Sequence, residues 1–300
     1  PGARPDGGRL RSGAAGIDPL AHLLPRRDPL RRTRLLGVLN LTPDSFYDGG
    51  RNASPEAAAA RARALVEAGA DALDLGAESS RPGADAVSER EELDRLLPVL
   101  ERVAELGVPI SVDTVKAGVA RRALAAGATI VNDISALAFD PGMAAVCAEA
   151  GAPVILMHMR GSPRDMQTRT DYDDVVDEVA RHLGERLEAA VRAGIPESNV
   201  LLDPGIGFAK TADQSLELLR RLPELRALGR PVVVGASRKS FLSRYSGEAP
   251  ADRLPGTLAA GVLAVQRGAH VLRVHDVDEH ARAVRAAEAI LGGAPAAVEE

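Results

Sequence analysis

The chain alternates between two kinds of segment. Alanine-rich or charged stretches with a hydrophobic stripe end in glycine, and an apolar run rich in β-branched residues begins soon afterwards. Glycine is favoured behind a helix because the residue there often adopts the left-handed conformation, which costs other residues about 1 kcal/mol or more. The glycines that mark predicted helix ends are Gly69, Gly107, Gly127, Gly151, Gly194, Gly229 and Gly268.

These seven helix ends predict seven strands after them, and one more apolar run precedes the first helix. The runs cover residues 35–39, 72–75, 109–112, 129–132, 153–157, 200–202, 232–235 and 271–274. Each is short and almost continuously apolar, which is typical of parallel strands covered on both faces. Eight strand and helix repeats predict an α/β protein with a single eight-stranded parallel β/α (TIM) barrel, and an open sheet is the alternative.

The remaining segments define the limits of the predicted domain. Helices are expected at 54–68 and 89–106, the first of them capped by Ser54 with Pro55 at its first position. Residues 1–33 are rich in Gly, Pro and Arg without periodicity, which predicts a poorly ordered N-terminal extension. The barrel is expected to occupy 34–293, followed by a tail at 294–300.

Composition excludes several classes of partner. With 45% hydrophobic residues, 26% charged residues and a net charge of −5, the chain lacks the basic excess of nucleic-acid-binding proteins. Its apolar runs are shorter than the roughly 20 residues of a membrane span, and no signal-peptide pattern follows the N-terminal arginines. We expect a cytoplasmic protein without nucleic-acid or membrane partners. Cys147, the single cysteine, is expected to be a buried thiol.

Polar side chains follow every predicted strand. An Asp or Asn at such a position is often only a helix cap, but all eight strand ends carry an acid, an amide or a cation. Because catalytic groups of β/α barrels come from these ends, we expect a functional site there. The residues are Asn40, Thr42, Pro43, Asp44, Asp74, Glu78, Ser79, Ser80, Arg81, Asp113, Asn132, Asp133, His158, Arg160, Asp203, Ser237, Arg238, Lys239, Ser240, Arg273 and His275.

Charge divides the strand-end residues into two sets. One set mixes acceptors and donors, as needed to read the edges of a flat heterocycle with amino and oxo groups. It consists of Asp113, Asn132, Asp203 and Lys239. The other set is cationic and rich in donors, which suits a diphosphate. It consists of Asn40, Ser80, Arg81, Arg273 and His275.

Cofactor motifs are few. The segment that begins at Asp203 places two glycines and Phe208 beside a carboxylate, which favours close approach of a planar ligand, but it lacks the third glycine of a dinucleotide-binding motif. No phosphate loop, zinc-type histidine pair or nucleophile–base pair is found, so we expect neither NAD, ATP, zinc nor covalent catalysis. The acids after His275 fit a helix start better than a metal site. Mg²⁺ bound between a diphosphate and Asn40 would fit the preference of this ion for water and substrate oxygens.

Eight ordered motifs closely resemble dihydropteroate synthases of bacterial folate biosynthesis, a family of pterin-binding barrels. They read LLGVLNLTPDSFYDGG, LGAESSRPGA, PISVDT, IVNDIS, MHMRGSP, LLDPGIGFAKT, GASRKS and RVHDV, between residues 35 and 291. The resemblance implies condensation of (7,8-dihydropterin-6-yl)methyl diphosphate with 4-aminobenzoate to give 7,8-dihydropteroate and diphosphate. It also implies Mg²⁺ as cofactor, a homodimer and a target of sulfonamides.

The resemblance also implies residue roles, with Asp113, Lys239 and Arg81 as catalytic residues. Pterin would be bound by Asp113, Asn132, Met157, Asp203, Phe208 and Lys239. Diphosphate would be bound by Asn40, Ser80, Arg81, Arg273 and His275, and the metal by Asn40. The 4-aminobenzoate pocket would comprise Phe46, Arg81, Pro82 and Ser240.

The implied mechanism is dissociative: diphosphate leaves, Asp113 supports the pterin cation, and the aniline nitrogen attacks. The loops after the first two strands would become ordered over bound substrate.

The chain departs from the family pattern at Ala77 and Ala209, where glycine is frequent, at Ile206, where phenylalanine is frequent, and at Tyr47, where serine is common. Two alternatives are a barrel that transfers a methyl group from a folate and a non-catalytic paralogue that only binds pterin; the intact cationic motifs favour the synthase over both.

Overall fold

The computed structural model describes residues 33–42, 54–247, 249 and 252–292. The predicted contact residue Phe46 and the departure at Tyr47 lie outside these ranges, as do the predicted C-terminal tail and the extension except for Thr33. Thr33 itself is buried, and its backbone N–H donates to the Glu288 carboxylate of the last helix at 2.5 Å.

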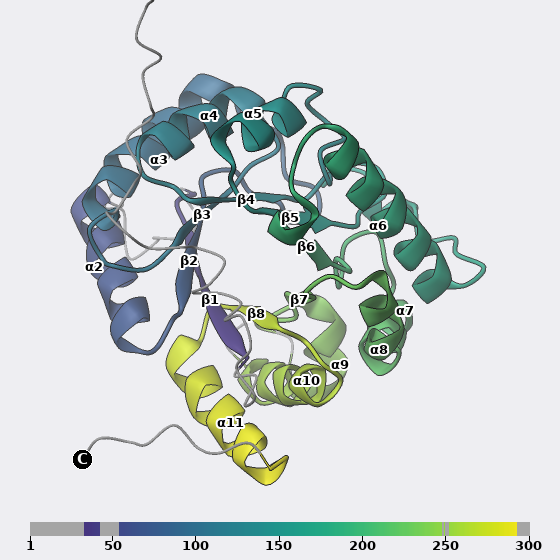
Figure 1. Cartoon of the computed structure of the whole chain (residues 1–300). Helices are drawn as coiled ribbons and strands as arrows, with labels where there is room; N and C mark the ends of the chain where they lie inside the picture. Colours follow the sequence, from purple (N-terminus) through teal and green to yellow (C-terminus); the bar gives the residue numbers. More distant parts are fainter. Residues whose placement is uncertain (1–32, 43–53, 248, 250–251, 293–300) are drawn as a thin grey trace, which may run out of the picture.

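Eight parallel strands form a closed ring in the middle of the described structure (Figure 1). They are β1 (Arg34–Asn40), β2 (Ala72–Gly76), β3 (Ile110–Asp113), β4 (Ile130–Asp133), β5 (Val154–Met157), β6 (Val200–Asp203), β7 (Val233–Val234) and β8 (Val271–Val274). Neighbouring strands follow one another from β1 to β6, and β8 lies between β1 and β7. A parallel bridge from Leu202 to Val232 joins β6 to β7. The ring is thus a barrel and not the open sheet that was the alternative.

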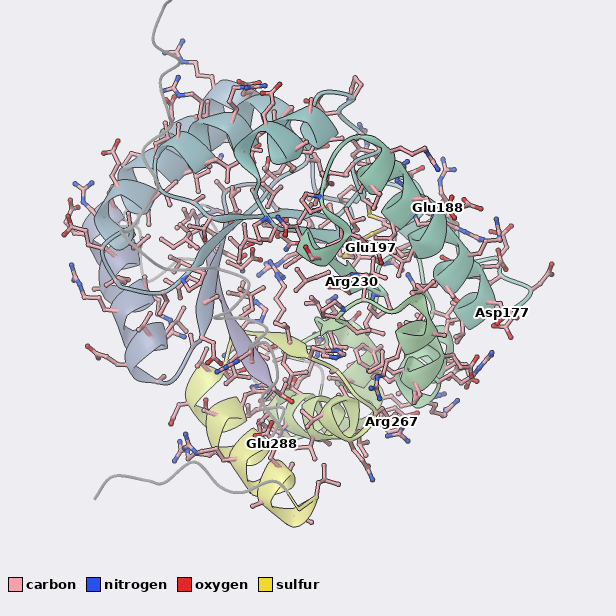
Figure 2. The ribbon with its side chains drawn as sticks, viewed as in Figure 1. Asp177, Glu188, Glu197, Arg230, Arg267 and Glu288 are labelled. Atoms are coloured by element: carbon pink, nitrogen blue, oxygen red, sulfur yellow. The ribbon has the colours of Figure 1, made fainter. Side chains whose placement is uncertain are left out.

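The helices surround the strands (Figure 1). They are α2 (Pro55–Glu67), α3 (Glu89–Val103), α4 (Ala117–Ala125), α5 (Met143–Ala150), α6 (Val175–Arg192), α7 (Ala212–Arg220), α8 (Leu222–Leu225), α9 (Ser243–Ser246), α10 (Leu254–Gln266) and α11 (Val277–Ile290). Short 3-10 turns are η2 (Met166–Thr168), η3 (Glu197–Asn199), η4 (Arg226–Leu228) and η5 (Ser240–Leu242). Charged side chains lie on the outer side of the helices, as Figure 2 shows for Asp177 and Glu188 on α6.

The barrel interior is filled by side chains. A buried cluster takes one apolar residue from each of seven strands: Leu36, Ala72, Ile130, Ile155, Leu201, Val233 and Val271. Toward the carboxyl ends of the strands this apolar layer gives way to polar residues, because side chains two positions further along a strand point the same way. Asp74, Asn132, Asp203 and Arg273 each follow a member of the cluster by two residues. A layer of polar side chains therefore lies next to the apolar cluster, on the side of the carboxyl ends of the strands.

The sequence predictions for local structure are confirmed with small differences. All seven helix-end glycines have positive φ. The Ser54 side chain accepts from the backbone N–H of Ala57, as expected for a helix cap. The seventh strand is shorter than predicted, since only Val233 and Val234 form its ladder and Val232 makes an isolated bridge.

Two further expectations concern Cys147 and membranes. Cys147 is fully buried, and this burial raises the pKa of its thiol to about 12, so the thiolate needed for reaction is not formed at neutral pH. Within the described ranges, none of the helices combines the length and the apolar character that crossing a membrane requires.

Candidate active site

The candidate site lies at the carboxyl ends of the strands. Parallel strands bring all these ends to one mouth of the barrel. Asn40, Asp113 and Asp203 are the last residues of β1, β3 and β6. Asn132 and Arg273 are the penultimate residues of β4 and β8. The fold therefore gathers residues from both predicted sets.

Arg273 is the link between these residues. Its Nε donates to Oδ2 of Asp74 at 2.6 Å, and its Nη2 donates to Oδ2 of Asp113 at 2.8 Å. The same oxygen of Asp74 accepts from Nδ2 of Asn132 at 3.1 Å. One fully buried carboxylate thus orients both a cation of the predicted diphosphate set and an amide of the predicted ring-binding set.

Electrostatics differ sharply between the two ends of the Arg273–Asp113 pair. Burial raises the pKa of Asp113 to about 7, although the Arg273 guanidinium opposes the shift. For Arg273, burial favours loss of the proton, but Asp74 and Asp113 outweigh it and raise its pKa. At neutral pH the site therefore holds a permanent cation beside a carboxylate close to its titration midpoint.

Lys239 follows β7, and its ammonium and the Asp203 carboxylate lie on either side of Gly235. A Cβ on Gly235 would lie 3.8 Å from Asp203 Oδ2, 3.8 Å from Lys239 Nζ and 3.9 Å from Arg273 Cβ. The Lys239 ammonium donates to the carbonyl of Ile206 and lies 4.4 Å from the centre of the Phe208 ring. Burial lowers its pKa to about 8, with Asp203 acting in the opposite direction.

Met157 and Phe208 share one apolar wall. Buried Met157 packs in a cluster with Ile134, Met159, Met166 and Ala209, against which the partly buried Phe208 lies. This wall adjoins the Lys239 ammonium through the Phe208 ring. A flat ring beside it would meet an apolar face and, at its edges, polar groups.

His275 is held by Ser237. The Ser237 hydroxyl lies 3.0 Å from Nδ1 of His275, and its oxygen accepts a hydrogen bond from the backbone N–H of His275 at 3.2 Å. Burial and the nearby Arg273 lower the pKa of His275 to about 3, so the imidazole is neutral. If the hydroxyl donates to Nδ1, the remaining N–H of the neutral ring is at Nε2.

Asp276, the residue after His275, is engaged by Arg238. Its carboxylate pairs with the Arg238 guanidinium, including a contact of 2.9 Å from Arg238 Nε. His280 Nδ1 lies 2.7 Å from the backbone carbonyl of Asp276. Among the residues that the structure describes, no three His, Cys, Asp or Glu side chains are grouped to hold a metal ion.

The predicted contact residues on the loops after β2 and β7 lie nearer the surface than the buried residues of the site. Arg81 and Pro82 are exposed, Ser80 is partly buried, and Ser240 is exposed at the start of η5. The backbone N–H of Gly83 donates to the carbonyl of Pro163 at 2.9 Å, which ties this loop to the loop after β5. Among the described residues, no side-chain hydrogen bond joins Ser80, Arg81 or Pro82 to the buried part of the site.

Asn40 lies where an oxygen ligand would be useful. Its Oδ1 lies 3.8 Å, and Asp113 Oδ2 3.6 Å, from the position that a Cβ of Gly76 would occupy. Glycine at this position leaves two oxygen donors around a space without a side chain. Such donors suit Mg²⁺, which keeps several water and substrate oxygens among its ligands.

Sequence reasoning missed two residues of this region. Asp74 stands among the strand-end residues, but nothing in its spacing shows that it binds Arg273 and Asn132. Lys210 lies in the LLDPGIGFAKT motif without an assigned role; in the structure it is buried, with Nζ 2.9 Å from Nδ1 of His158. Its position at the end of a glycine-rich loop was the one signal available.

Comparison with known proteins places the chain in a family. Residues 36–275 match the family model of pterin binding enzymes. The chain is 47% identical to the dihydropteroate synthase of a Synechocystis species, over 87% of this chain and 91% of that protein.

Solved structures agree with this family. A Xanthomonas albilineans dihydropteroate synthase with 4-aminobenzoic acid is 48% identical and superposes with a TM-score of 0.83, covering 88% of this chain and 94% of that one. The Thermus thermophilus enzyme in complex with 6HMPPP is 46% identical, with a TM-score of 0.76 and coverage of 88% and 95%. The chain therefore belongs to the pterin-binding enzyme family and, within it, to the dihydropteroate synthases.

Proposed function

We propose that the chain joins (7,8-dihydropterin-6-yl)methyl diphosphate to 4-aminobenzoate, giving 7,8-dihydropteroate and diphosphate, and that the mouth of the barrel carries the reaction. The observation that carries this proposal is the contact of Arg273 with Asp113. It brings the Arg273 guanidinium, which would stabilise the departing diphosphate, next to the Asp113 carboxylate, which would stabilise the cation that develops on the pterin. No protein nucleophile is needed for such a reaction.

The pterin is proposed to lie against Met157 and Phe208. Asp113, Asn132 and Asp203 would accept from or donate to its amino and oxo edges, and Lys239 would donate to a ring acceptor. Because Lys239 already lies beside the Phe208 ring, its ammonium would meet the ligand at the edge of the apolar wall. This arrangement supports a slot that binds one face of the ring and reads its edges.

The diphosphate is proposed to bind at Arg273, His275, Asn40, Ser80 and Arg81. The contacts of Arg273 with Asp74 and Asp113 use two of the five N–H donors of its guanidinium. Neutral His275 would add one N–H without adding charge. As the bond to the pterin methylene breaks, these donors would stabilise the leaving anion while the Asp113 carboxylate stabilises the cation left behind.

The 4-aminobenzoate is proposed to bind nearer the surface, at Arg81, Pro82 and Ser240, with Phe46 as a further contact outside the described residues. The exposure of Arg81, Pro82 and Ser240 fits a second substrate that enters after the pterin is in place. The Ser240 hydroxyl and the N-terminal end of η5 would receive its carboxylate. Closure of the loops after β1 and β2 over bound substrate remains part of this proposal.

Three further proposals concern cofactor, assembly and compartment. Asn40 would hold Mg²⁺, which would neutralise charge on the diphosphate. A homodimer is supported by exposed apolar side chains such as Leu263 on α10 and Ile290 on α11, and light scattering of the purified protein would test it. A cytoplasmic location would fit a chain whose single cysteine is a buried free thiol and forms no internal disulfide.

The deciding experiment measures diphosphate release from (7,8-dihydropterin-6-yl)methyl diphosphate and Mg²⁺, with and without 4-aminobenzoate. The wild type is compared with Lys239→Ala and with Arg181→Ala, which removes an exposed ion pair to Glu185 on α6. We expect release that requires 4-aminobenzoate, yields 7,8-dihydropteroate, collapses in Lys239→Ala and persists in Arg181→Ala. Tight pterin binding without release would indicate the non-catalytic paralogue instead.

A further inference from the structure

Four consecutive backbone carbonyls in the loop after β6 each accept a hydrogen bond from a different side chain. Gln167 Nε2 donates to Gly207 at 3.0 Å, Lys210 Nζ donates to Phe208 at 2.8 Å, and the Tyr172 hydroxyl donates to Ala209 at 2.9 Å. The fourth carbonyl, that of Ile206, accepts from Lys239. The donors come from the loops after β5, β6 and β7, so side chains of three loops hold this short segment.

The backbone of this segment needs such support. Gly205, Gly207 and Ala209 all have positive φ, of 66°, 80° and 50°. Alternating left-handed residues cannot form a helix or strand ladder, so the carbonyls must find other donors. The segment is therefore held by side chains rather than by regular secondary structure.

Lys210 is the most buried of these donors. Only 3% of its surface is exposed, whereas Gln167 is exposed and Tyr172 is partly buried. Besides the Phe208 carbonyl, its Nζ contacts Nδ1 of His158 at 2.9 Å and the His158 carbonyl at 3.5 Å. His158 is the first residue after β5, and Lys210 thereby joins the ends of two neighbouring strands.

The approach of these two strand ends is unusually close. A Cβ on Gly205 would lie 2.0 Å from the carbonyl oxygen of His158, so no other residue fits there. The backbone N–H of Gly205 donates to Asp203 Oδ1 at 2.7 Å, which fixes the carboxylate proposed to bind pterin. Lys210 thus acts on Phe208 through its carbonyl and on the Asp203 region through His158 and Gly205.

Charge adds to this role. Burial lowers the pKa of Lys210 well below its ordinary value, and Asp203 opposes that shift. Burial also lowers the pKa of His158, with Lys210 adding to the effect, so the imidazole is neutral and its Nδ1 accepts from the lysine. A neutral histidine at this position can accept a hydrogen bond from the Lys210 amino group.

We propose that Lys210 is a positioning residue of the pterin site, which holds the loop from Gly205 to Ala209 in its binding geometry before ligand arrives. It contacts neither reacting atoms nor substrate; it presents the Phe208 ring and supports the Asp203 carboxylate from behind. The proposal rests on the proposed function for the identity of the ligand, but the holding of the loop is a property of the chain alone.

The test combines amide hydrogen exchange with ligand binding in the full-length protein. In the ligand-free wild type, the amides of Gly205, Phe208 and Thr211 are expected to exchange slowly, because they donate to Asp203, Gly205 and Gln214 respectively. In Lys210→Met, these amides should exchange at least about tenfold faster, because the buried carbonyl of Phe208 loses its side-chain donor. The affinity for pteroic acid should fall by about the same factor.

Two comparisons make the result specific. Gln167→Ala removes an exposed donor to the same loop, and its affinity for pteroic acid should stay within about threefold of the wild type, because water replaces an exposed donor. In steady-state assays of Lys210→Met, the KM for the pterin diphosphate should rise more than the KM for 4-aminobenzoate. A general loss of structure would change both constants together.

Fast exchange of the Gly205, Phe208 and Thr211 amides in the ligand-free wild type would overturn the proposal, and this measurement does not depend on whether a variant folds. Unchanged exchange and unchanged pteroic acid affinity in Lys210→Met would also overturn it. If the wild type bound pteroic acid but released no diphosphate, the proposed function would fail while the exchange and binding data still decided the role of Lys210.

Discussion

The Nε of Arg273 lies 2.6 Å from Oδ2 of Asp74, a carboxylate with no exposed surface. Asp74 is in register with Ser111 on β3 and Val38 on β1, inside the barrel. It therefore supports Arg273 from beneath, while Asp113 contacts the same guanidinium nearer the mouth. A buried charge pair of this kind serves mainly to fix geometry, because desolvation offsets much of its attraction.

Replacing Asp74 should damage both stability and the site. In Asp74→Ala, Arg273 and Asn132 lose a shared acceptor, and we expect the free energy of unfolding to fall by about 3 kcal/mol, at the low end for a broken buried pair since Asp113 still neutralises Arg273. Urea denaturation measures this loss. Asp278→Ala, which removes an exposed partner of Arg282, should change stability by less than about 0.5 kcal/mol. Equal effects of the two substitutions would contradict a special role for Asp74.

Much of the fold was predictable because its signals are local and repeated. The helix-end glycines and the apolar runs each reflect a requirement of one turn or one strand, and eight repeats leave little freedom in topology. The β7 strand was the exception. Its length depends on how Val232 meets Leu202 across the closing edge of the barrel, and that contact is not encoded in the pattern around residue 232.

The site was predictable at the level of position and less so at the level of partners. Strand ends identify Asp113, Asn132, Asp203, Lys239 and Arg273 as neighbours, because parallel strands share one mouth. Sequence does not reveal that Asp74 binds Arg273, since the two are 199 residues apart along the chain. It likewise does not reveal Lys210, because a buried lysine is recognised only from the carbonyls around it.

Ala209 offers a test of backbone strain in the loop after β6. Its φ of 50° lies in the left-handed region, which costs a residue with a Cβ about 1–2 kcal/mol. Ala209→Gly relieves this cost but adds about 0.4–1 kcal/mol of unfolded-state entropy. We expect a net gain in unfolding free energy of roughly 0.5–1 kcal/mol, measured by urea denaturation.

The matched control is Ala193→Gly. Ala193 ends α6 with a φ of −77°, where alanine is not strained. This substitution brings only the entropic cost, so it should destabilise by about 0.4–1 kcal/mol. If both substitutions destabilised the protein to the same extent, the positive φ of Ala209 would have no measurable cost in free energy of unfolding.

Lys116 should be required for the stability of the β2–α3 region. Its Nζ pairs with Glu92 at 2.7 Å and with Glu78, and the Glu92 side chain is fully buried. Burial raises the pKa of Glu92 while Lys116 opposes the shift. In Lys116→Met the buried carboxylate loses its cation, and we expect a loss of about 3–5 kcal/mol at pH 8.

The loss should be smaller in acid, and the sign follows from linkage. A carboxyl whose folded-state pKa is above its ordinary value of 4.5 contributes stability below that value, and this contribution is lost as the pH rises through the folded-state pKa. Lys116→Met should therefore approach the wild type in urea denaturation as the pH falls from 8 to 5. Arg121→Met, which breaks an exposed pair with Glu149, should show a small effect independent of pH. A pH-independent loss in Lys116→Met would argue against an uncompensated Glu92.

The pH dependence of activity should report Asp113 and Lys239. The pKa of Asp113 is raised to about 7 by burial, and that of Lys239 is lowered to about 8, also by burial. If the reaction needs an ionised Asp113 and a protonated Lys239, kcat/KM for the pterin diphosphate falls below pH 7 and above pH 8. We expect a narrow bell-shaped profile with its maximum between these values.

Two variants assign the limbs of that profile. Asp113→Asn should remove the acidic limb together with most of the activity, because the amide cannot support the cation as a carboxylate does. Lys239→Arg keeps a cation that does not lose its proton in the accessible range, so its residual activity should persist above pH 8. If kcat/KM of the wild type were constant from pH 6 to 9, neither the pKa of Asp113 near 7 nor the pKa of Lys239 near 8 would control the reaction. An alkaline limb unchanged in Lys239→Arg would assign that limb to another residue.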